Sequence, residues 1–234
     1  MPKTKEVLDK ISLFESIKPY IMMGGTALSL QIKHRLSEDI DFCQWKNFKN
    51  QKLNVNYAGI EEELAAIGQF QKILISANQV DYIVNGVKIT FYCDNRLKQP
   101  EGLKAIDYKN NIKLADINSI GIMKLEVSLR RAVFRDYYDI FSIIKAGGDF
   151  NTIVDGTLKY SQHNLRSRDV ISILGNGSTF YNYENIEYLC PQYDVTTKEI
   201  EEFLIPYIKQ YMKSKEKAIL QKYQDGTNQQ IGKQ

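Results

Sequence analysis

Residues 21–42 constrain the fold more strongly than any other stretch of the chain. An apolar run ends at Gly24-Gly25, an apolar helical pattern follows, and the stretch closes with Asp39-Ile40-Asp41. In an extended strand, residues i and i+2 lie on one face, so we expect the two carboxylates to point to the same place. The pattern predicts a strand, a glycine turn, a short helix and a second strand.

The residue types in this stretch suit a phosphate group and a divalent cation. Two neighbouring carboxylates repel each other unless a positive charge lies between them, and Mg²⁺ is typically held by one or two carboxylates with phosphate oxygens. Gly24 and Gly25 permit a sharp turn, and the unpaired N–H groups of a helix that begins near Thr26 can bind phosphate. We predict that Asp39 and Asp41 bind Mg²⁺ or Mn²⁺ beside this phosphate site.

The same stretch resembles the nucleotidyltransferase superfamily, whose signature is an apolar residue, a glycine pair and then two aspartates separated by one residue. The segment that begins at Gly24, with Arg35 and Ser37 ahead of the aspartates, is more narrowly similar to the AbiEii/AbiGii toxin-type nucleotidyltransferases. The resemblance implies an α/β nucleotidyltransferase fold that binds a nucleoside triphosphate (NTP). The implied NTP-binding residues are Gly24, Gly25, Thr26, Arg35, Ser37 and Lys124.

Two later segments resemble the same family. Lys124 lies in a predicted helix at the position where the family's lysine is thought to contact the triphosphate, and Asp136 matches the family's catalytic aspartate. Taken alone, Lys124 is an ordinary solvated lysine, and Asp136 stabilises the first turn of a helix in which Arg135 and Asp139 pair. Because four motifs occur in the family's order over residues 21–145, we prefer the catalytic interpretation. The predicted catalytic residues are Asp39, Asp41, Lys124 and Asp136.

One position departs from the superfamily pattern. Many nucleotidyltransferases carry a third metal-binding carboxylate on a later strand, and the expected position here holds Thr90. Asp81, Asp94 or Asp136 are the candidates to replace it, or the metal has two carboxylate ligands only. The two histidines carry weaker hypotheses: His34 contacts a phosphate, and His163 is a surface residue.

Composition limits the class of protein. The 234 residues are 43% hydrophobic and 25% charged, with a net charge of +3, which excludes a disordered chain and does not by itself indicate nucleic-acid binding. The three cysteines, Cys43, Cys93 and Cys190, show no metal-site spacing and are expected to be reduced. No long apolar run and no apolar signal segment occur, so we expect a soluble, cytoplasmic protein without a membrane partner.

The periodicity predicts a mixed sheet with flanking helices and a helical C-terminal half. Asn85-Gly86 indicates a hairpin, residues 94–111 are expected to form a long loop, and Asp116 is a candidate helix cap. We predict a nucleotidyltransferase α/β core at 1–114 and a helical region at 115–234 that completes the cleft. The predicted helices are near residues 7–17, 60–70, 116–132, 134–145, 169–174 and 197–215.

The predicted reaction moves a nucleoside monophosphate (NMP) from an NTP to a hydroxyl group of a tRNA 3′ end or of a protein. The resemblance implies a toxin of a toxin–antitoxin or phage-defence system, with a cognate antitoxin as a possible partner. The alternative is a catalytically inactive module of the same fold that binds nucleotide or RNA. Candidate RNA contacts are the basic stretch Lys98–Lys113 and the pairs Arg130/Arg131 and Arg166/Arg168.

Overall fold

The computed structural model describes residues 2–46, 48, 50–180 and 186–231. Its seven strands form one sheet in the order β3-β4-β5-β2-β1-β7-β6. β2 is parallel to β5 and β1 to β7, and the other neighbours are antiparallel, as the predicted mixed sheet requires. The strands are β1 (Ile21–Met23), β2 (Ile40–Lys46), β3 (Phe70–Ser76), β4 (Gln79–Val84), β5 (Val87–Lys98), β6 (Ala105–Lys109) and β7 (Ile112–Ala115).

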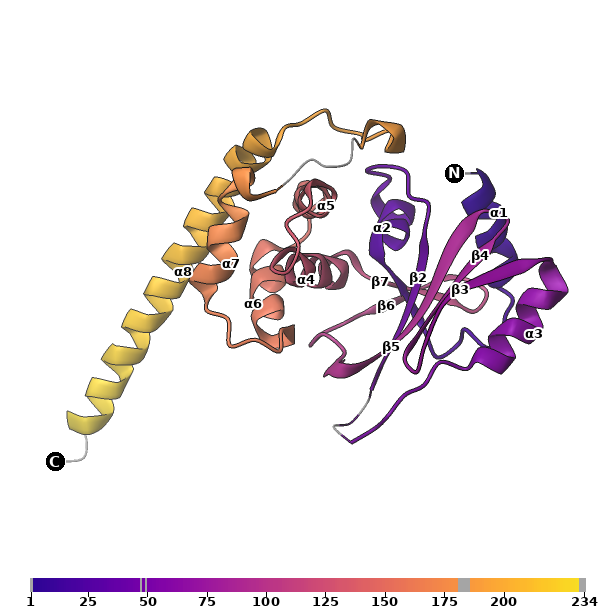
Figure 1. Ribbon diagram of the computed structural model, residues 1–234. Helices are drawn as coiled ribbons and strands as arrows, with labels where there is room; N and C mark the ends of the chain where they lie inside the picture. Colours follow the sequence, from indigo (N-terminus) through magenta and orange to yellow (C-terminus); the bar gives the residue numbers. More distant parts are fainter. Residues whose placement is uncertain (1, 47, 49, 181–185, 232–234) are drawn as a thin grey trace.

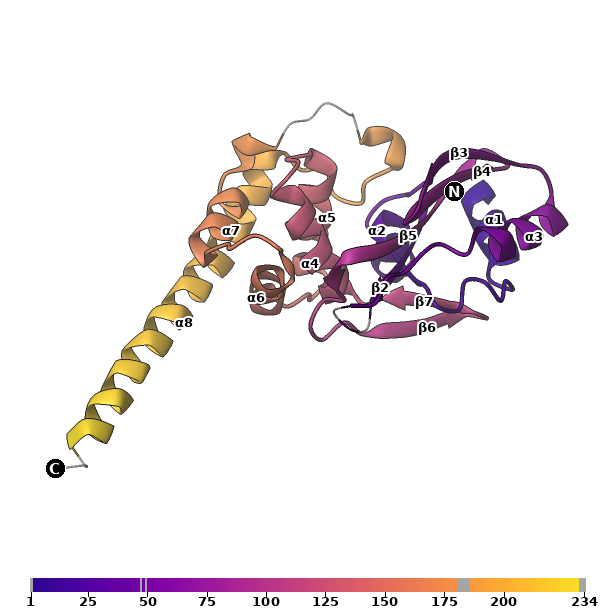
Figure 2. The same cartoon turned by 60° about the horizontal axis from the view of Figure 1, so that its bottom comes forward.

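The helices form two groups around this sheet. In both views, α1 and α3 lie on the side of the sheet away from α4–α8, and α8 extends far beyond its neighbours (Figures 1 and 2). The helices are α1 (Pro2–Ile11), α2 (Gly24–Ile32), α3 (Tyr57–Ile67), α4 (Ile117–Ser128), α5 (Phe134–Lys145), α6 (Phe150–Tyr160), α7 (Ser167–Leu174) and α8 (Thr197–Ile231), with short 3₁₀ turns η1 (Gly177–Thr179) and η2 (Glu187–Leu189). A helical second half therefore follows the sheet, and a domain boundary at residue 114 stays a prediction.

The two faces of the sheet meet different partners. The Tyr82 hydroxyl on β4 donates a 2.8 Å hydrogen bond to Glu61 of α3, so the Tyr82 face packs toward α3. Trp45 on β2 donates its indole N–H to Tyr160 of α6 at 3.1 Å. Since side chains alternate along a strand, Asp41 shares the face of Trp45. The predicted metal ligand is thus on the face turned toward the helical half.

Local sequence signals place several of these elements correctly. Asn85 and Gly86 both have positive φ, 51° and 79°, as the tight turn between β4 and β5 needs. The Asp116 carboxylate caps α4 by accepting a hydrogen bond from the Ser119 N–H at 3.3 Å. Within the described residues, no helix is long and apolar enough to cross a membrane.

Three predictions about chain segments are wrong, the first of which is the helix near residues 7–17, because α1 begins at Pro2 and ends at Ile11. The expected loop at residues 94–111 contains the end of β5, all of β6 and the turn into β7, with Asn110 at φ 48° in that turn. β6 is a short, exposed edge strand, and although Ile106 and Tyr108 alternate with polar residues, the nearby Pro100 and Gly102 favoured a loop in the sequence.

The last helix continues past residue 215 to Ile231. Good helix formers occupy residues 216–224, but the helix also includes Asp225-Gly226-Thr227-Asn228, whose helix propensity is low.

Candidate functional site

The start of α2 lies directly against the carboxylate of Asp41. Gly24 is the first residue of this helix and has φ of 78°, a backbone conformation that favours glycine. A Cβ added to Gly24 would lie 2.7 Å from Asp41 Oδ2. Glycine is therefore required both by the turn and by the close approach, and the free N–H groups at the start of α2 lie beside the predicted metal ligand.

The segment before β2 folds back over the first turn of α2. A Cβ added to Gly25 would lie 2.7 Å from Arg35 Nη2 and 3.0 Å from Ser37 Oγ. The Thr26 hydroxyl donates a hydrogen bond to the backbone carbonyl of Asp39. The structure thus brings together the predicted site residues of this stretch, namely Gly24, Gly25, Thr26, Arg35, Ser37, Asp39 and Asp41.

Asp41 is partly buried in the sheet. Its cross-strand neighbours are Met23 on β1 and Thr90 on β5, and the Thr90 side chain hydrogen-bonds to it. Burial and the nearby charge of Asp39 raise the pKa of Asp41 to about 6, while Lys124 and Lys88 act in the opposite direction. The fold therefore keeps two like charges close together, an arrangement that a divalent cation stabilises.

The strand register shows what stands at the position of the missing third carboxylate. Thr90 lies opposite Asp41, and Asp81 of β4 lies opposite Thr90, so the three residues form a row on one face. Two strand spacings separate Asp81 from Asp41, roughly 10 Å. The Asp81 carboxylate is moreover already bound by Lys88 Nζ at 3.0 Å and by Gln79 Nε2 at 2.9 Å.

Asp94 is also remote from the pair. It lies opposite Trp45, four residues beyond Asp41 along the parallel strands, which corresponds to about 13 Å. Within the residues that the structure describes, no group of three or more His, Cys, Asp or Glu side chains is arranged to hold a metal. A metal at this place would therefore have Asp39 and Asp41 as its protein carboxylates.

Lys88 is a residue of the site that the sequence analysis did not identify. Its ammonium is held by Asp81, whose hydrogen bond raises the pKa of Lys88, and Asp39 and Asp41 add smaller effects in the same direction. Lys88 is two residues before Thr90 on β5, so it points from the same face. Because Lys88 is two residues before Thr90, where the third carboxylate is expected, alternation along the strand could have predicted that Lys88 faces the site.

Asp139 is the centre of a buried network of charged side chains. Its carboxylate, 0% exposed, accepts hydrogen bonds from Arg35 Nε at 2.7 Å and Arg35 Nη2 at 2.8 Å. His34 Nε2 at 2.8 Å and Lys124 Nζ at 2.7 Å complete its partners. Burial alone would raise the pKa of Asp139, but the charges of Lys124 and Arg35 hold that pKa well below its ordinary value.

Lys124 joins this network to Asp136. Its ammonium is 2.8 Å from Asp136 Oδ1, and Arg131 Nε is 3.1 Å from Asp136 Oδ2. Asp136 is 1% exposed and the Lys124 side chain 13%. Burial lowers the pKa of Lys124, but Asp139 and Asp136 outweigh it and raise that pKa, so the ammonium stays charged. Lys124 is therefore a fixed positive charge near Asp41, unlike an ordinary solvated lysine.

The structure changes the interpretation of Arg35, His34 and Asp139. Arg35 is 4% exposed, and its guanidinium contacts Asp139 and the Leu36 carbonyl, so the pairing of Asp139 with Arg135 is replaced by one with Arg35. His34 is 1% exposed and stacks on Tyr138, and burial lowers its pKa. The predicted phosphate contact of His34 is therefore wrong, because this ring is enclosed in the core. His163 is exposed, as predicted.

These contacts fasten the strand–helix half of the site to the helical half. The Tyr138 hydroxyl on α5 donates to the His34 carbonyl at 3.1 Å, next to the bidentate pair of Arg35 with Asp139. Asp139 and Arg35 are 104 positions apart in the chain. The loop that leads into Asp39 and Asp41 is thus positioned by α5, and Lys124 of α4 is oriented by the same carboxylate.

The candidate RNA contacts are mostly engaged in ion pairs. Arg130 pairs with Glu126 at 2.6 Å, Arg131 with Asp136, and Arg166 with Asp169 at 3.3 Å. Lys109 pairs with Asp9 at 2.8 Å, and the side chain of Lys98 lies outside the described part of the chain. Arg131, with a side chain 58% exposed, is the member of this set that directly adjoins the site.

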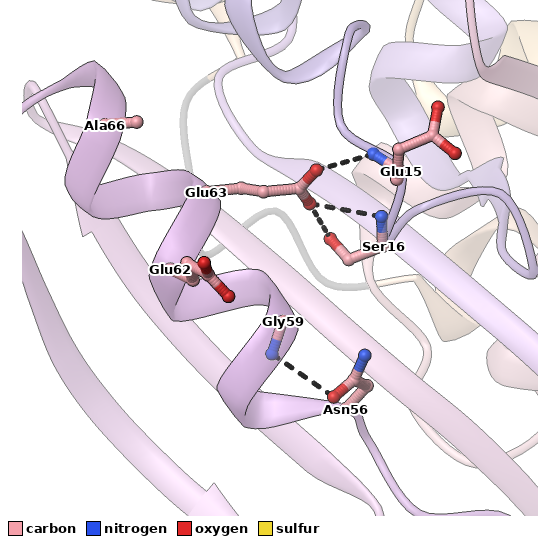
Figure 3. A pocket seen from close by; sticks show the side chains of 7 residues that line it. All are labelled: Glu15, Ser16, Asn56, Gly59, Glu62, Glu63 and Ala66. Carbon is pink, nitrogen blue, oxygen red and sulfur yellow. Dashed lines mark hydrogen bonds between the residues drawn. The ribbon is translucent and has the colours of Figure 1, made fainter.

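A hollow of about 600 Å³ lies between α3 and the segment after α1, away from these residues. Glu63 there accepts hydrogen bonds from the backbone N–H groups of Glu15 and Ser16 (Figure 3). Three of its lining residues are glutamates, Glu15, Glu62 and Glu63, which repel the phosphates of a nucleotide. We therefore do not place the NTP there.

The contact between Gly24 and Asp41 leads to a prediction. Alanine at position 24 combines a strained φ with a Cβ 2.7 Å from the carboxylate, so Asp41 must move. We expect NMP transfer to fall by about 100-fold, because displacements of about 1 Å at a reacting centre have that effect. Gly86→Ala is the matched control, since Gly86 has φ of 79° but open space around it. Similar losses of activity in both variants, measured by transfer of labelled NMP, would contradict this role of Gly24.

This chain is similar to three known proteins. The protein aq_aa25 of Aquifex aeolicus (strain VF5) is 24% identical over 221 residues, which cover 90% of this chain and 96% of that protein. The structure is similar to MenT4, nucleotidyltransferase toxin Rv2826c from Mycobacterium tuberculosis H37Rv, with a TM-score of 0.56, 13% identity and coverage of 86% of this chain and 80% of that one. JHP933 from Helicobacter pylori gives a TM-score of 0.49, 16% identity and coverage of 94% and 97%.

The likeness to MenT4 supports the nucleotidyltransferase fold that the motifs imply. A family model described as the nucleotidyl transferase AbiEii toxin of the type IV toxin–antitoxin system matches residues 6–229. That match includes the glycine turn, both aspartates, Lys124 and the buried network around Asp139. The chain therefore belongs to the AbiEii toxin family of nucleotidyltransferases.

Proposed function

We propose that this protein transfers an NMP from an NTP to a hydroxyl group of RNA, such as a tRNA 3′ end, or of a protein. The hydroxyl oxygen forms a bond to the α-phosphorus, the bond from that phosphorus to pyrophosphate breaks, and the hydroxyl proton is released to water. One observation carries the proposal: the N-terminus of α2, the Asp39 and Asp41 pair and the charged Lys124 all meet at one place.

The phosphate chain is proposed to lie at the start of α2. The N–H groups of Gly24, Gly25 and Thr26 have no partners within the helix and can bind phosphate oxygens. The Ser37 hydroxyl lies above Gly25 and can donate a further hydrogen bond. Lys124, held by Asp136 and Asp139, stabilises the charge on the pyrophosphate as it leaves.

Asp39 and Asp41 fit a divalent cation such as Mg²⁺ or Mn²⁺. The raised pKa of Asp41 shows that burial and the neighbouring carboxylate disfavour its ionised form in the metal-free protein. Two carboxylates supplemented by phosphate oxygens and water are a suitable set for Mg²⁺. When bound, the ion would neutralise charge on the phosphates.

The contacts of Asp136 and Arg35 change their proposed roles. Because the Asp136 carboxylate is buried between Lys124 and Arg131, we propose that it holds these two cations toward the phosphates rather than accepting a proton. We propose that Arg35 acts through Asp139, because its donors are already engaged there and at the Leu36 carbonyl.

As a toxin of this family, the protein is proposed to arrest growth and to be counteracted by a cognate antitoxin. Induced expression of the wild-type chain should stop colony formation, and expression of Asp41→Ala should not. Equal toxicity of the two proteins would show that the toxic effect does not depend on nucleotide transfer.

The test of the proposed reaction is label transfer from each of the four α-labelled NTPs, with Mg²⁺, to total tRNA and to lysate protein. We expect label on one acceptor class with one preferred NTP, and none with Asp41→Ala. Label on protein alone would retain the mechanism and exclude RNA as acceptor. If the wild-type protein labels nothing while it binds NTP, the proposed transfer is incorrect.

A second candidate is a nucleotide- or RNA-binding module without catalysis. The observation that favours it is Thr90 in place of a third carboxylate, with Asp81 already bound by Lys88. This alternative predicts that NTP binding, measured by calorimetry, is unchanged when EDTA replaces Mg²⁺. The transferase proposal predicts weaker NTP binding in EDTA.

A further inference from the structure

A second hollow, of about 470 Å³, opens on the sheet face beside Asp41. Its lining includes Met23, Asp41, Asn78, Gln79, Thr90 and Tyr92. This volume is within the range of pockets that bind small organic ligands. Thr90 and Tyr92 are two residues apart on β5, and Gln79 of β4 lies opposite Tyr92, so the hollow follows one face of these strands.

The strand order locates this hollow relative to the phosphate site. β1, which leads into Gly24 and α2, is on one side of β2, whereas β5 and β4 are on the other. Asp41 of β2 therefore lies between the proposed phosphate site and most of the hollow. A molecule in the hollow can reach the reacting centre from the side opposite the start of α2.

This position has a chemical consequence if the proposed transfer is correct. In phosphoryl-type transfer, the attacking oxygen and the leaving oxygen lie roughly in line, on opposite sides of the phosphorus. With the pyrophosphate at Gly24–Thr26 and Lys124, the attacking hydroxyl must approach from the β5 side. We propose that the hollow binds the terminal nucleoside of an RNA acceptor and presents its ribose hydroxyl near Asp41 and Thr90. This inference rests on the proposed transferase function.

The lining residues are suited to a base and a sugar. Tyr92 supplies an aromatic ring, and stacking on aromatic side chains is a general way to bind unpaired RNA bases. Asn78 and Gln79 carry carboxamides, which both donate to and accept from base edges. Their orientation is set by hydrogen bonds, from Gln79 Nε2 to Asp81 Oδ1 at 2.9 Å and from Ser76 Oγ to Asn78 Oδ1 at 3.1 Å.

The charge of the hollow argues against a triphosphate as its occupant. Its lining, within the described part of the chain, contains the Asp41 carboxylate but no lysine or arginine. Phosphate groups would be repelled there, whereas a neutral nucleoside is accepted. A serine or threonine of a protein acceptor would neither need the aromatic ring nor fill this volume, and label on protein in the test below would indicate a tyrosine acceptor instead.

The experiment compares Tyr92→Ala and Tyr92→Phe with Tyr188→Ala, an exposed tyrosine in the helical half, as the matched control. The KM for acceptor RNA and the dissociation constant for NTP are measured for each. Tyr92→Ala should raise the KM for RNA by about 5- to 100-fold, because stacking of one base is lost, and should leave NTP binding unchanged. Tyr92→Phe keeps the ring and should resemble the wild type, as should Tyr188→Ala.

Other outcomes would overturn the assignment. A comparable loss of NTP affinity in Tyr92→Ala would place the base of the NTP in the hollow. An unchanged KM for RNA, or label on protein alone, would exclude the RNA terminus from it. Thermal unfolding verifies that each variant folds. If Tyr92→Ala does not fold, Gln79→Ala is measured in its place.

The failure of this inference can be distinguished from failure of the proposed transfer. If the wild type transfers label and Asp41→Ala does not, an unchanged KM for RNA in Tyr92→Ala refutes only the nucleoside site. If the wild type transfers nothing, binding of a short single-stranded oligoribonucleotide is measured by fluorescence anisotropy. Weaker binding by Tyr92→Ala would then support the nucleoside site without catalysis, and equal binding would reject it.

Discussion

Replacing Asp139 by alanine is expected to lower the free energy of unfolding by about 3–5 kcal/mol, because it leaves buried charges without their partner. Arg35 would lose both bonds of its bidentate pair, Lys124 one of its two carboxylates, and His34 its acceptor. Since Asp139 is fully buried, water cannot replace these contacts. Urea denaturation followed by circular dichroism measures the change.

Asp169→Ala is the matched control for this loss. Asp169 also pairs with an arginine, Arg166 at 3.3 Å, but on an exposed helix start. Its removal should lower the free energy of unfolding far less than removal of Asp139, because water screens and replaces this exposed contact. If Asp139→Ala were no more destabilising than Asp169→Ala, the network would not be what joins the two halves.

The same carboxylate gives the expected acid dependence. The charges of Lys124 and Arg35 hold the pKa of Asp139 well below its ordinary value of 3.8 in the folded protein, despite burial. Its contribution is therefore complete above the unfolded pKa and is lost as the pH falls toward the folded one. We expect the wild-type free energy of unfolding to decline below about pH 4, and that of Asp139→Asn to decline less.

Asp41→Asn is expected to reduce NMP transfer by about 1,000-fold or more, since an amide cannot replace a carboxylate as a ligand of a hard cation. The folded protein should not be weakened. In metal-free buffer, asparagine removes the repulsion between Asp41 and Asp39, which contributes to raising the pKa of Asp41 to about 6. Loss of activity without loss of stability is the signature of a residue kept for function.

Two measurements test this combination. Transfer of labelled NMP gives the activity, and thermal unfolding with and without Mg²⁺ and NTP gives the stability. Mg²⁺ with NTP should raise the unfolding temperature of the wild type and have little effect on Asp41→Asn. An equal rise in unfolding temperature in both proteins would show that Asp41 is not a ligand of the metal. A much lower unfolding temperature of Asp41→Asn than of the wild type in metal-free buffer would show that Asp41 has a structural role.

Local patterns were sufficient for much of the fold and for part of the site. Asn85-Gly86 predicted its hairpin because the tight turn needs positive φ at both positions, and Asp116 predicted its helix because a cap is a contact between near neighbours. Asp41 lies in β2 and Asp39 directly precedes this strand, so the proximity of the two carboxylates likewise depends on near neighbours in the chain. Edge strand β6 was missed because it is only five residues long and follows the loop-forming residues Pro100 and Gly102.

The partners of the charged residues could not be predicted from local sequence patterns. Sequence spacing suggested that Asp139 pairs with Arg135, four positions away, whereas the folded chain gives it Arg35, His34 and Lys124. The roles of Asp81 and Lys88 depend on the register of β4 against β5, which an isolated strand does not specify.

By itself, then, the sequence determined the elements, the glycine turn, the paired aspartates and the family that carries them. Only the tertiary structure decided that Arg35 and His34 are buried under α5, that Asp136 is held between two cations, and that a hollow opens on the β5 side of Asp41. The physical reason is range: caps, turns and strand alternation act over a few residues. The partner of a buried charge, in contrast, is chosen by packing between segments as much as 105 residues apart.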